Sequence, residues 1–592
     1  MYITKFKSAP ALTAVAALAL MAVGCTDENY DLENIDTTVQ VTVNDLTLPL
    51  NLGPVKFSSL VDLDGEECIE TVGNEYVLVQ SGDIDPQNIR VDRVVANAEV
   101  TTTTKRQVDI PYAPGTSADI ERMEFPYTYD NNFDMDKYIK KLKSGKVTLP
   151  FTFTLSLFDM ATGSDVDASI SDLQIEIPVG FYGTYETPAG TTETITPANR
   201  VITFTGTRVP RNGEFTYEID ITDVDVEKIL AQDNGSFIDY ATGHLVFKGE
   251  INIVGGKLNF DQDVAYGIHT TELTASINLG RLTIEAITGE VQYSLDDLKG
   301  ADIDLGNLPK ELRDPQTNIV LNNPQLYLQL TNPVYDYNLQ GSVGLKIRQL
   351  RNGQTAGTPA ETVSPAVIRP VEGPQNYVLT APGATVSSYY DGYAEPTPSR
   401  LDMNGLSTLV SGEGLPSALK VDLLSPQVSG EVVDFPLGVN LGDVTGKYTI
   451  YAPLSFGAGS QIVYEQTQQG WDFGSDQDFE ISKLEIKAKV DSKLPVNLSL
   501  SAWPVDANGN EILDNGEHVA LEVSPAVINP ADGPVDLTIT LTGKIQKIDG
   551  IRYAVKILSD GNTEALGPDQ EIVLTDIRAK VTGHYTYTDE DK

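Results

Sequence analysis

Histidine, cysteine and tryptophan are scarce in this chain of 592 residues. There are four histidines, two cysteines and two tryptophans. The histidines are far apart and no cysteine lies near them, so a zinc site is not expected. They stand at His244, His269, His518 and His584.

The sequence also lacks short catalytic motifs. It contains no Gly-x-x-x-x-Gly-Lys-Ser/Thr phosphate loop and no Gly-x-Ser-x-Gly nucleophile turn. A glycoside hydrolase needs two carboxylates at a set distance, which the fold determines, so no pair can be chosen among 84 acidic residues. We therefore expect a non-enzymatic protein without a cofactor, and a glycoside hydrolase-like enzyme is an alternative.

Positive charge is in short supply. The chain has 41 Lys and Arg against 84 Asp and Glu, a net charge of −43. A field of this sign repels nucleic acids and other anionic polymers. Nucleic-acid binding is thus not expected, and a polysaccharide ligand would be neutral.

Long hydrophobic runs are absent except at the start of the chain. Lys5 and Lys7 precede an apolar run from residue 9 to residue 23, and small residues lead up to Cys25. A basic segment, a short apolar core and small residues before a cleavage point are typical of a signal peptide. Residues 1–24 are therefore predicted to be removed. Because they carry two lysines and no acid, their loss takes the net charge from −43 to −45.

The sequence Ala22-Val23-Gly24-Cys25 resembles the lipobox of bacterial lipoproteins, although Ala22 stands where leucine is usual. The resemblance implies cleavage before Cys25 and attachment of palmitate-type acyl chains to it. These chains would anchor the protein to a membrane. Cys68 would then have no disulfide partner. The alternative is an ordinary signal peptide followed by an incidental cysteine.

Acidic residues follow Cys25 closely, at Asp27, Glu28 and Asp31. An acidic tether over residues 25–40 resembles that of Bacteroidetes surface lipoproteins, in which acids after the cysteine act as an export signal. The resemblance implies the outer face of the outer membrane. The periplasmic face is the alternative, because an acidic linker needs no further purpose.

Apolar and polar residues alternate along much of the chain, as in residues 151–157, 484–490 and 537–542. Such strands bury one face and expose the other. With 49 Gly and 33 Pro between them, they predict an all-β fold of tandem antiparallel β-sandwich-like modules. A few short helices are expected at residues 135–143, 225–230 and 308–312.

A twelve-residue segment occurs twice. Residues 363–374 and 523–534 are identical at nine of twelve positions, 160 residues apart. Pro365 and Pro370 have no amide donor, which favours an edge strand. We prefer this structural explanation to a ligand site. A looser pair joins residues 308–325 to residues 415–427.

The repeats divide the chain into expected units. The last of them, repeat 2, would carry inserted strands. The units are the signal peptide 1–24, the tether 25–40, a β module over 41–130, a β module with short helices over 131–289, repeat 1 over 290–400 and repeat 2 over 401–592.

One acidic loop is a weak candidate for calcium. Oxygen-bearing side chains stand at loop positions 1, 3, 5, 9 and 12, but glycine is missing from position 6. Asn508-Gly509 is also typical of a hairpin turn, which is the preferred interpretation. The candidate ligands are Asp506, Asn508, Asn510, Asp514 and Glu517.

Tyrosines gather in a segment rich in Gly, Pro and Ser. Tyr389, Tyr390, Asp391 and Tyr393 lie in a predicted loop, where tyrosine faces can stack on sugars and the carboxylate can bind hydroxyls. Packing between modules would produce the same sequence.

The sequence therefore predicts a lipid-anchored, non-enzymatic cell-envelope protein with a binding or structural role. Its partners would be the membrane, through the lipid, and neutral polysaccharide or other envelope proteins. A glycan-binding accessory lipoprotein of a polysaccharide-uptake system is the first alternative.

Overall fold

The structure is a computed structural model, and it describes most of the chain after residue 38. The predicted all-β fold is confirmed, because 64% of the chain is strand and 4% is helix. The described residues are 39–49, 55–56, 68–95, 100–112, 115–131, 135–166, 168–260, 267–296, 298–305, 308–470, 478–514, 516–519 and 521–587.

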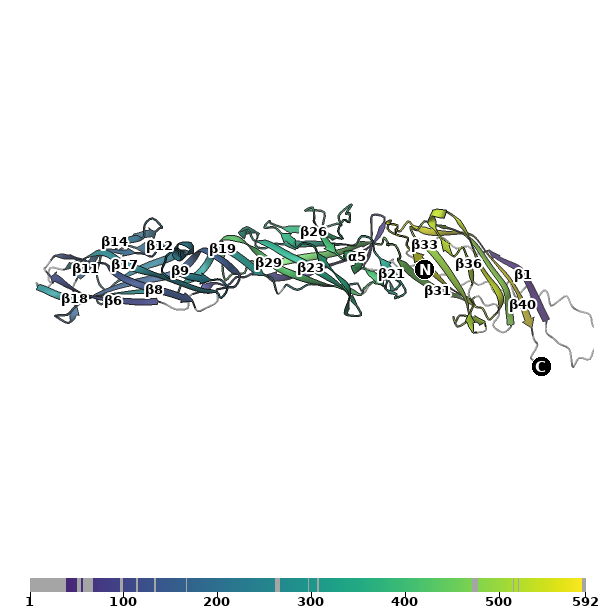
Figure 1. Ribbon diagram of the computed structural model, residues 1–592, viewed down its shortest axis with the longest axis horizontal. Coiled ribbons are helices and arrows are strands. Elements are labelled where there is room, and N and C mark those ends of the chain that lie inside the picture. The colour runs from purple at the N-terminus through teal and green to yellow at the C-terminus, as the bar shows by residue number, and fades with distance from the viewer. Residues whose placement is uncertain are drawn as a thin grey trace, which may run out of the picture.

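Three β-sandwiches lie end to end in an elongated molecule (Figure 1). We call them the distal, middle and C-terminal sandwiches. The distal sandwich is the one farthest from the first and last described strands, and each sandwich has two facing sheets.

The distal sandwich is built from a continuous part of the chain. Its first sheet holds β6 (Val100–Tyr112), β9 (Ile139–Asp159), β10 (Ser164–Asp165), β12 (Phe181–Glu186), β13 (Thr192–Ile195), β15 (Glu214–Asp225) and β18 (Gly267–Leu279). Its second sheet holds β7 (Ser117–Asp119), β8 (Met123–Asn131), β11 (Ala168–Glu176), β14 (Val201–Arg208), β16 (Phe237–Asp239) and β17 (His244–Phe260).

The middle sandwich combines strands from both sides of the distal one. Its first sheet holds β3 (Ile69–Val72), β4 (Glu75–Asn88), β22 (Gln325–Thr331), β26 (Pro374–Thr380), β27 (Ser399–Asn404) and β30 (Asp443–Pro453). Its second sheet holds β5 (Val94–Val95), β19 (Thr283–Ser294), β20 (Asp302–Asp304), β23 (Gln340–Arg351), β24 (Gln354–Thr362), β25 (Ala366–Ile368) and β29 (Ala418–Pro436). Strands from the expected ranges 41–130, 131–289, 290–400 and 401–592 thus share one sandwich.

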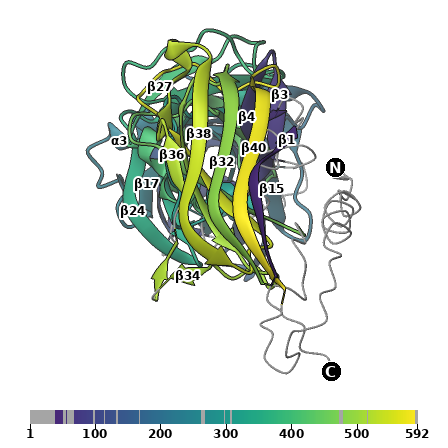
Figure 2. The same cartoon turned by 90° about the vertical axis from the view of Figure 1, so that its right-hand side faces the viewer.

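The C-terminal sandwich joins the two ends of the described chain. Its first sheet holds β1 (Val39–Pro49), β2 (Val55–Lys56), β32 (Asp478–Ser492), β36 (Glu522–Ser524), β38 (Val535–Gln546) and β40 (Glu571–Tyr587). Figure 2 shows β38, β32, β40 and β1 side by side in this sheet. Its second sheet holds β21 (Asn318–Val320), β28 (Ser411–Glu413), β31 (Gln461–Gln469), β33 (Asn497–Val505), β37 (Val527–Ile528) and β39 (Gly550–Leu558).

The remaining elements are short. A small hairpin pairs β34 (Leu513–Asp514) with β35 (Glu517–His518). The helices within the described ranges are α3 (Val226–Leu230), α4 (Lys310–Arg313), α5 (Leu406–Leu409), η1 (Tyr335–Tyr337) and η2 (Pro530–Asp532). Within the described residues, no helix is long and apolar enough to cross a membrane.

The three sandwiches share one strand order. The first sheets run β15–β9–β18–β6, β26–β22–β30–β4 and β38–β32–β40–β1. The second sheets run β14–β11–β17–β8, β25–β23–β29–β19 and β37–β33–β39–β31. Among the eight strands named for each sandwich, the one named last in the first sheet comes earliest in the sequence.

This common order reveals nested insertion. The chain forms β1, leaves the C-terminal sandwich and forms β4 of the middle one. It then builds the whole distal sandwich and returns to complete the middle sandwich between β19 and β30, a stretch from which β21 and β28 join the C-terminal sandwich. Strands β31 to β40 finish the C-terminal sandwich. The middle and C-terminal sandwiches therefore each depend on a strand far away in the sequence.

The alternating segments form strands as predicted. Residues 151–157 lie in β9, residues 484–490 in β32 and residues 537–542 in β38. The helix predicted at residues 225–230 is also present, as α3. Its N-cap is Asp225, whose carboxylate accepts a hydrogen bond from the Lys228 backbone N–H at 3.1 Å.

The helix predicted at residues 135–143 is wrong, because this segment leads into β9. Ile139 and Leu142 are both buried, and their spacing imitates one face of a helix. The register against β19 shifts between the pairs Lys141–Glu290 and Ile139–Val291, which marks a β-bulge. The extra residue brings two positions three apart onto the same face of the sheet.

The repeated segment occupies corresponding places in two sandwiches. Ile368 in β25 pairs with β23, and Ile528 in β37 pairs with β33. Both short strands lie at a sheet edge with prolines beside them, as the missing amide donors predict. The looser repeat is wrong, because residues 310–313 form α4 whereas residues 415–419 lead into β29.

Adjacent sandwiches share a hydrophobic core, and the distal and middle ones also share a strand. On β19, residues 283–291 pair with β9 of the distal sandwich, and residues 286–294 pair with β29 of the middle one. One hydrophobic cluster runs from the distal sandwich to Phe435 in the middle one, and a second joins the middle and C-terminal sandwiches. Strand pairing at the first junction and a shared core at both tie the three sandwiches together.

Candidate functional site

The predicted lipidation residue, Cys25, lies outside the described residues. The other cysteine, Cys68, is buried next to β3, with 1% of its surface exposed. It belongs to the core that joins the middle and C-terminal sandwiches.

The predicted tyrosine loop lies over the outer face of the middle sandwich. Tyr393 is 7% exposed, and its ring centroid is 5.2 Å from that of the fully buried Tyr327 on β22. The Tyr390 ring packs 5.4 Å from Tyr451 on β30. These four rings, Tyr327, Tyr390, Tyr393 and Tyr451, form what we call the tyrosine cluster.

Polar contacts hold the tyrosine loop in place. The Tyr390 hydroxyl donates to a Glu70 carboxylate oxygen at 3.0 Å, and the Tyr393 hydroxyl lies 3.1 Å from Oγ1 of Thr449. Burial, followed by the adjacent Glu70 carboxylate, raises the pKa of Tyr390 to about 12. Two of the three predicted tyrosines are thus engaged in packing.

Tyr389 and Asp391 face solvent more openly. Tyr389 is 39% exposed, and Asp391 accepts a hydrogen bond from the Gly392 backbone N–H at 2.9 Å. A single open ring beside a carboxylate is a small surface for a sugar, so stacking across three tyrosines would require the loop to open.

The predicted calcium loop begins with a tight turn. One oxygen of Asp506 accepts backbone N–H groups from Asn508 and Asn510, each at 2.9 Å, and the other oxygen lies 3.3 Å from Nδ2 of Asn510. These bonds, from Asn510 first, lower the pKa of Asp506. Asp514 and Glu517 pair across the β34–β35 hairpin. Calcium binding stays a prediction, and the turn uses both Asp506 oxygens itself.

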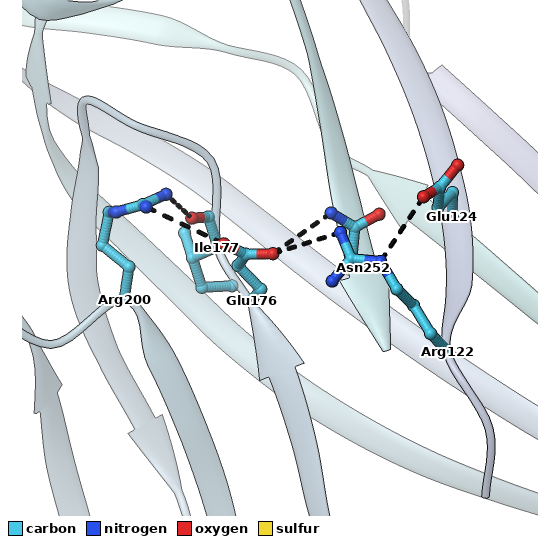
Figure 3. Close-up of polar contacts among 6 residues, drawn as sticks. All are labelled: Arg122, Glu124, Glu176, Ile177, Arg200 and Asn252. Carbon is cyan, nitrogen blue, oxygen red and sulfur yellow. Dashed lines mark hydrogen bonds and ion pairs between the residues drawn. The ribbon is translucent and has the colours of Figure 1, made fainter. Parts of the chain in front are cut away.

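Sequence reasoning missed a group of polar side chains on the distal sandwich. We call Glu124, Asn252 and Glu176, together with Arg122 and Arg200, the polar row. Glu124 on β8 pairs with Asn252 on β17, which pairs with Glu176 on β11. Figure 3 shows Glu176 between Arg200 on one side and Asn252 and Arg122 on the other.

The contacts within the polar row are long. Nδ2 of Asn252 donates to Glu176 at 3.3 Å, and the Arg122 and Arg200 guanidinium groups lie 3.5 and 3.8 Å from the same carboxylate. Strong charge-assisted bonds are nearer 2.8 Å. The only sequence signal for this row is Asn252 itself, an amide between Ile251 and Ile253 in an apolar stretch.

Two cavities among the described residues are small and lined mainly by apolar side chains. One lies between the sheets of the middle sandwich, lined by residues that include Leu330, Val343 and Val428. Another lies inside the distal sandwich, beside Tyr127 and Phe151. Both are packing defects in sandwich cores, without the convergent polar groups that a ligand pocket needs.

Comparison with family models, curated proteins and solved structures does not identify a functional site. No family model matches the chain, and no curated protein matches it. The chain is similar to a crystal structure described as "a putative secreted protein" from Parabacteroides distasonis. The two are 12% identical with a TM-score of 0.33, over 50% of this chain and 89% of that one. A TM-score of 0.33 carries no argument about function.

Proposed function

We propose that this chain is a non-enzymatic lipoprotein of the outer-membrane surface, in which a stiff rod of β-sandwiches presents the distal sandwich away from the membrane. One observation carries the proposal. β1 begins at Val39, fourteen residues after Cys25 in the sequence, and it lies in the sandwich at the opposite end of the rod from the distal one (Figure 1). A lipid on Cys25 would put the membrane at that end.

The stiff junctions support a presenting role. Because β19 is hydrogen-bonded to strands of two sandwiches, the distal sandwich cannot swing freely on a linker. Domains joined by flexible linkers move by default, and an extensive shared core removes that freedom. A rod of this kind keeps its far end at a fixed distance from its anchor.

Replacement of the anchor residue tests the proposal. We expect the wild-type protein in the outer-membrane fraction and digestible by protease added to intact cells. Cys25→Ser should prevent both acylation and cleavage before residue 25, so the protein should disappear from the outer-membrane fraction and keep residues 1–24. Cys68→Ser is the matched control, since it removes the other thiol and leaves the anchor. Outer-membrane retention of Cys25→Ser at the mature mass would contradict the anchor, and protection of the wild type from protease would indicate the periplasmic face.

A further inference from the structure

The polar row of the distal sandwich contains a buried polar atom without a partner. Asn252 is 6% exposed, and its Nδ2 donates to Glu176. Its carbonyl oxygen Oδ1 is buried and accepts no hydrogen bond. Turning the amide over would place Oδ1 against the Glu176 carboxylate, so the orientation is fixed. A buried acceptor left empty is costly, which makes the site a candidate for a missing donor.

A movable side chain lies next to Asn252. Arg122 reaches past it to Glu176, 3.5 Å away, and also contacts Glu124 at 3.4 Å. The Arg122 side chain is 52% exposed. Exposed ion pairs at such distances are weak, so a ligand can displace them easily. Displacement of Arg122 would open Asn252 and free the donors of the guanidinium group.

The balanced charges of the polar row favour an uncharged ligand. Two arginines and two glutamates cancel, and they alternate along the row. A cation would meet Arg122 and Arg200, whereas an anion would meet Glu124, Glu176 and the field of a chain at −43. A ligand without charge that carries both hydroxyl donors and hydroxyl acceptors meets neither obstacle.

The row has the shape for an extended ligand. Glu124, Asn252, Glu176 and Val201 lie on four neighbouring strands, β8, β17, β11 and β14, in cross-strand register. Three strand spacings of ~4.8 Å make the row about 14 Å long. Val201, which is 42% exposed, adds an apolar contact at one end.

We propose that the polar row binds a neutral saccharide chain. A sugar hydroxyl donates to Oδ1 of Asn252 after Arg122 moves aside, and neighbouring hydroxyls accept from Arg122 and Arg200 and donate to Glu124 and Glu176. The proposal rests on the surface-presenting role proposed above, which it supplies with a ligand class. It places the binding site on the distal sandwich, away from the tyrosine cluster of the middle one.

Calorimetric titration of the mature protein tests this proposal. The probes are neutral oligosaccharides of glucose, mannose and xylose, with polygalacturonate as the anionic comparison. We expect at least one neutral oligosaccharide to bind and polygalacturonate not to bind. Asn252→Leu keeps the volume and removes the acceptor, and it should weaken binding at least about tenfold, since a buried hydrogen bond is lost.

Two further variants keep the result interpretable. Asn259→Leu is the matched control, because Asn259 lies on the same strand outside the row and donates to Ser171 at 3.0 Å; it should leave binding unchanged. Arg122→Ala should weaken binding without altering the melting temperature, and it decides the outcome if Asn252→Leu unfolds. No binding of any neutral probe, tighter binding of polygalacturonate, or equal binding by wild type, Asn252→Leu and Arg122→Ala would overturn the proposal. The binding titrations do not depend on membrane fractionation, so a failure of the saccharide proposal can be distinguished from a failure of the lipid-anchor proposal.

Discussion

The middle and C-terminal sandwiches have the same order of hydrogen-bonded strands but different connections between those strands. In the middle sandwich, residues 381–417 separate β26 from β29 and include the tyrosine loop, β27, α5 and β28. In the C-terminal sandwich the equivalent strands, β38 and β39, are joined by residues 547–549 alone, with Lys547 at a φ of 63°. Strand pairing, which both sandwiches share, constrains the sequence and length of the strands, whereas surface connections can differ in length and sequence without disturbing the sheets. The repeated segment belongs to the framework, and the tyrosines belong to the connection.

The largest expected effect comes from removing the early edge strands. Deletion of residues 25–88 takes β1 from the C-terminal sandwich and β4 from the middle one, while every main strand of the distal sandwich remains. We expect the first two to lose cooperative unfolding and the distal sandwich to keep its hydrogen-exchange protection. Equal loss of protection in all three would show that the distal sandwich does not fold by itself.

Matched substitutions in the repeated segment test the equivalence of the two copies. Ile368 and Ile528 are each 5% exposed, so Ile368→Ala and Ile528→Ala should each destabilise their own sandwich by about 2–4 kcal/mol. Val367→Ala and Val527→Ala are the controls. These valines are 41% and 47% exposed, and their loss should cost less than ~0.5 kcal/mol. Denaturant unfolding measures the free energy of unfolding of all four variants. A large loss of stability for only one of the two isoleucine variants would show that the two copies of the repeated segment are not equivalent.

The tyrosine loop should respond unevenly to truncation. Tyr393→Ala removes a buried ring from the cluster and should cost about 3 kcal/mol in the unfolding free energy of the middle sandwich. Tyr389→Ala removes an open ring and should cost within ~0.5 kcal/mol. Thermal unfolding, with proteolysis of residues 381–398 as a second readout, checks both. Equal effects would mean that the cluster does not hold the loop.

The smallest expected effect is a dependence on high pH in the middle sandwich. Burial raises the pKa of Tyr327 and of Tyr390 from 10.0 to about 12. A raised folded-state pKa stabilises the fold below the unfolded value, and this stability is lost as pH rises from about 10 through about 12. Tyrosinate absorbance and the melting temperature should follow this window, and Tyr390→Phe should diminish the change. An unchanged pH profile in Tyr390→Phe would exclude a contribution from that hydroxyl.

The local elements of the fold follow directly from short stretches of sequence. Alternation in residues 151–157 fixes a strand because side chains on successive residues point to opposite faces. Asp225 starts α3 because its carboxylate caps a backbone N–H. Pro365 and Pro370 exclude a central strand because they lack an amide donor. Each of these three predictions depends on one residue or on a repeat of a few residues, which can be read directly from the sequence.

The identity of neighbouring strands, in contrast, depends on packing across the whole fold. Val39 pairs with Tyr587 across almost the whole chain, and no local property of either strand specifies that partner. The bulge in β9 depends on its register with β19, so residues 135–143 imitate a helix until the sheet is known. The burial of Tyr393, and the meeting of Arg122, Glu176 and Asn252, likewise follow from ladders between distant segments. Backbone hydrogen bonds can form between almost any two strands. The partner and register of each strand are therefore determined by the burial of a complete sheet face.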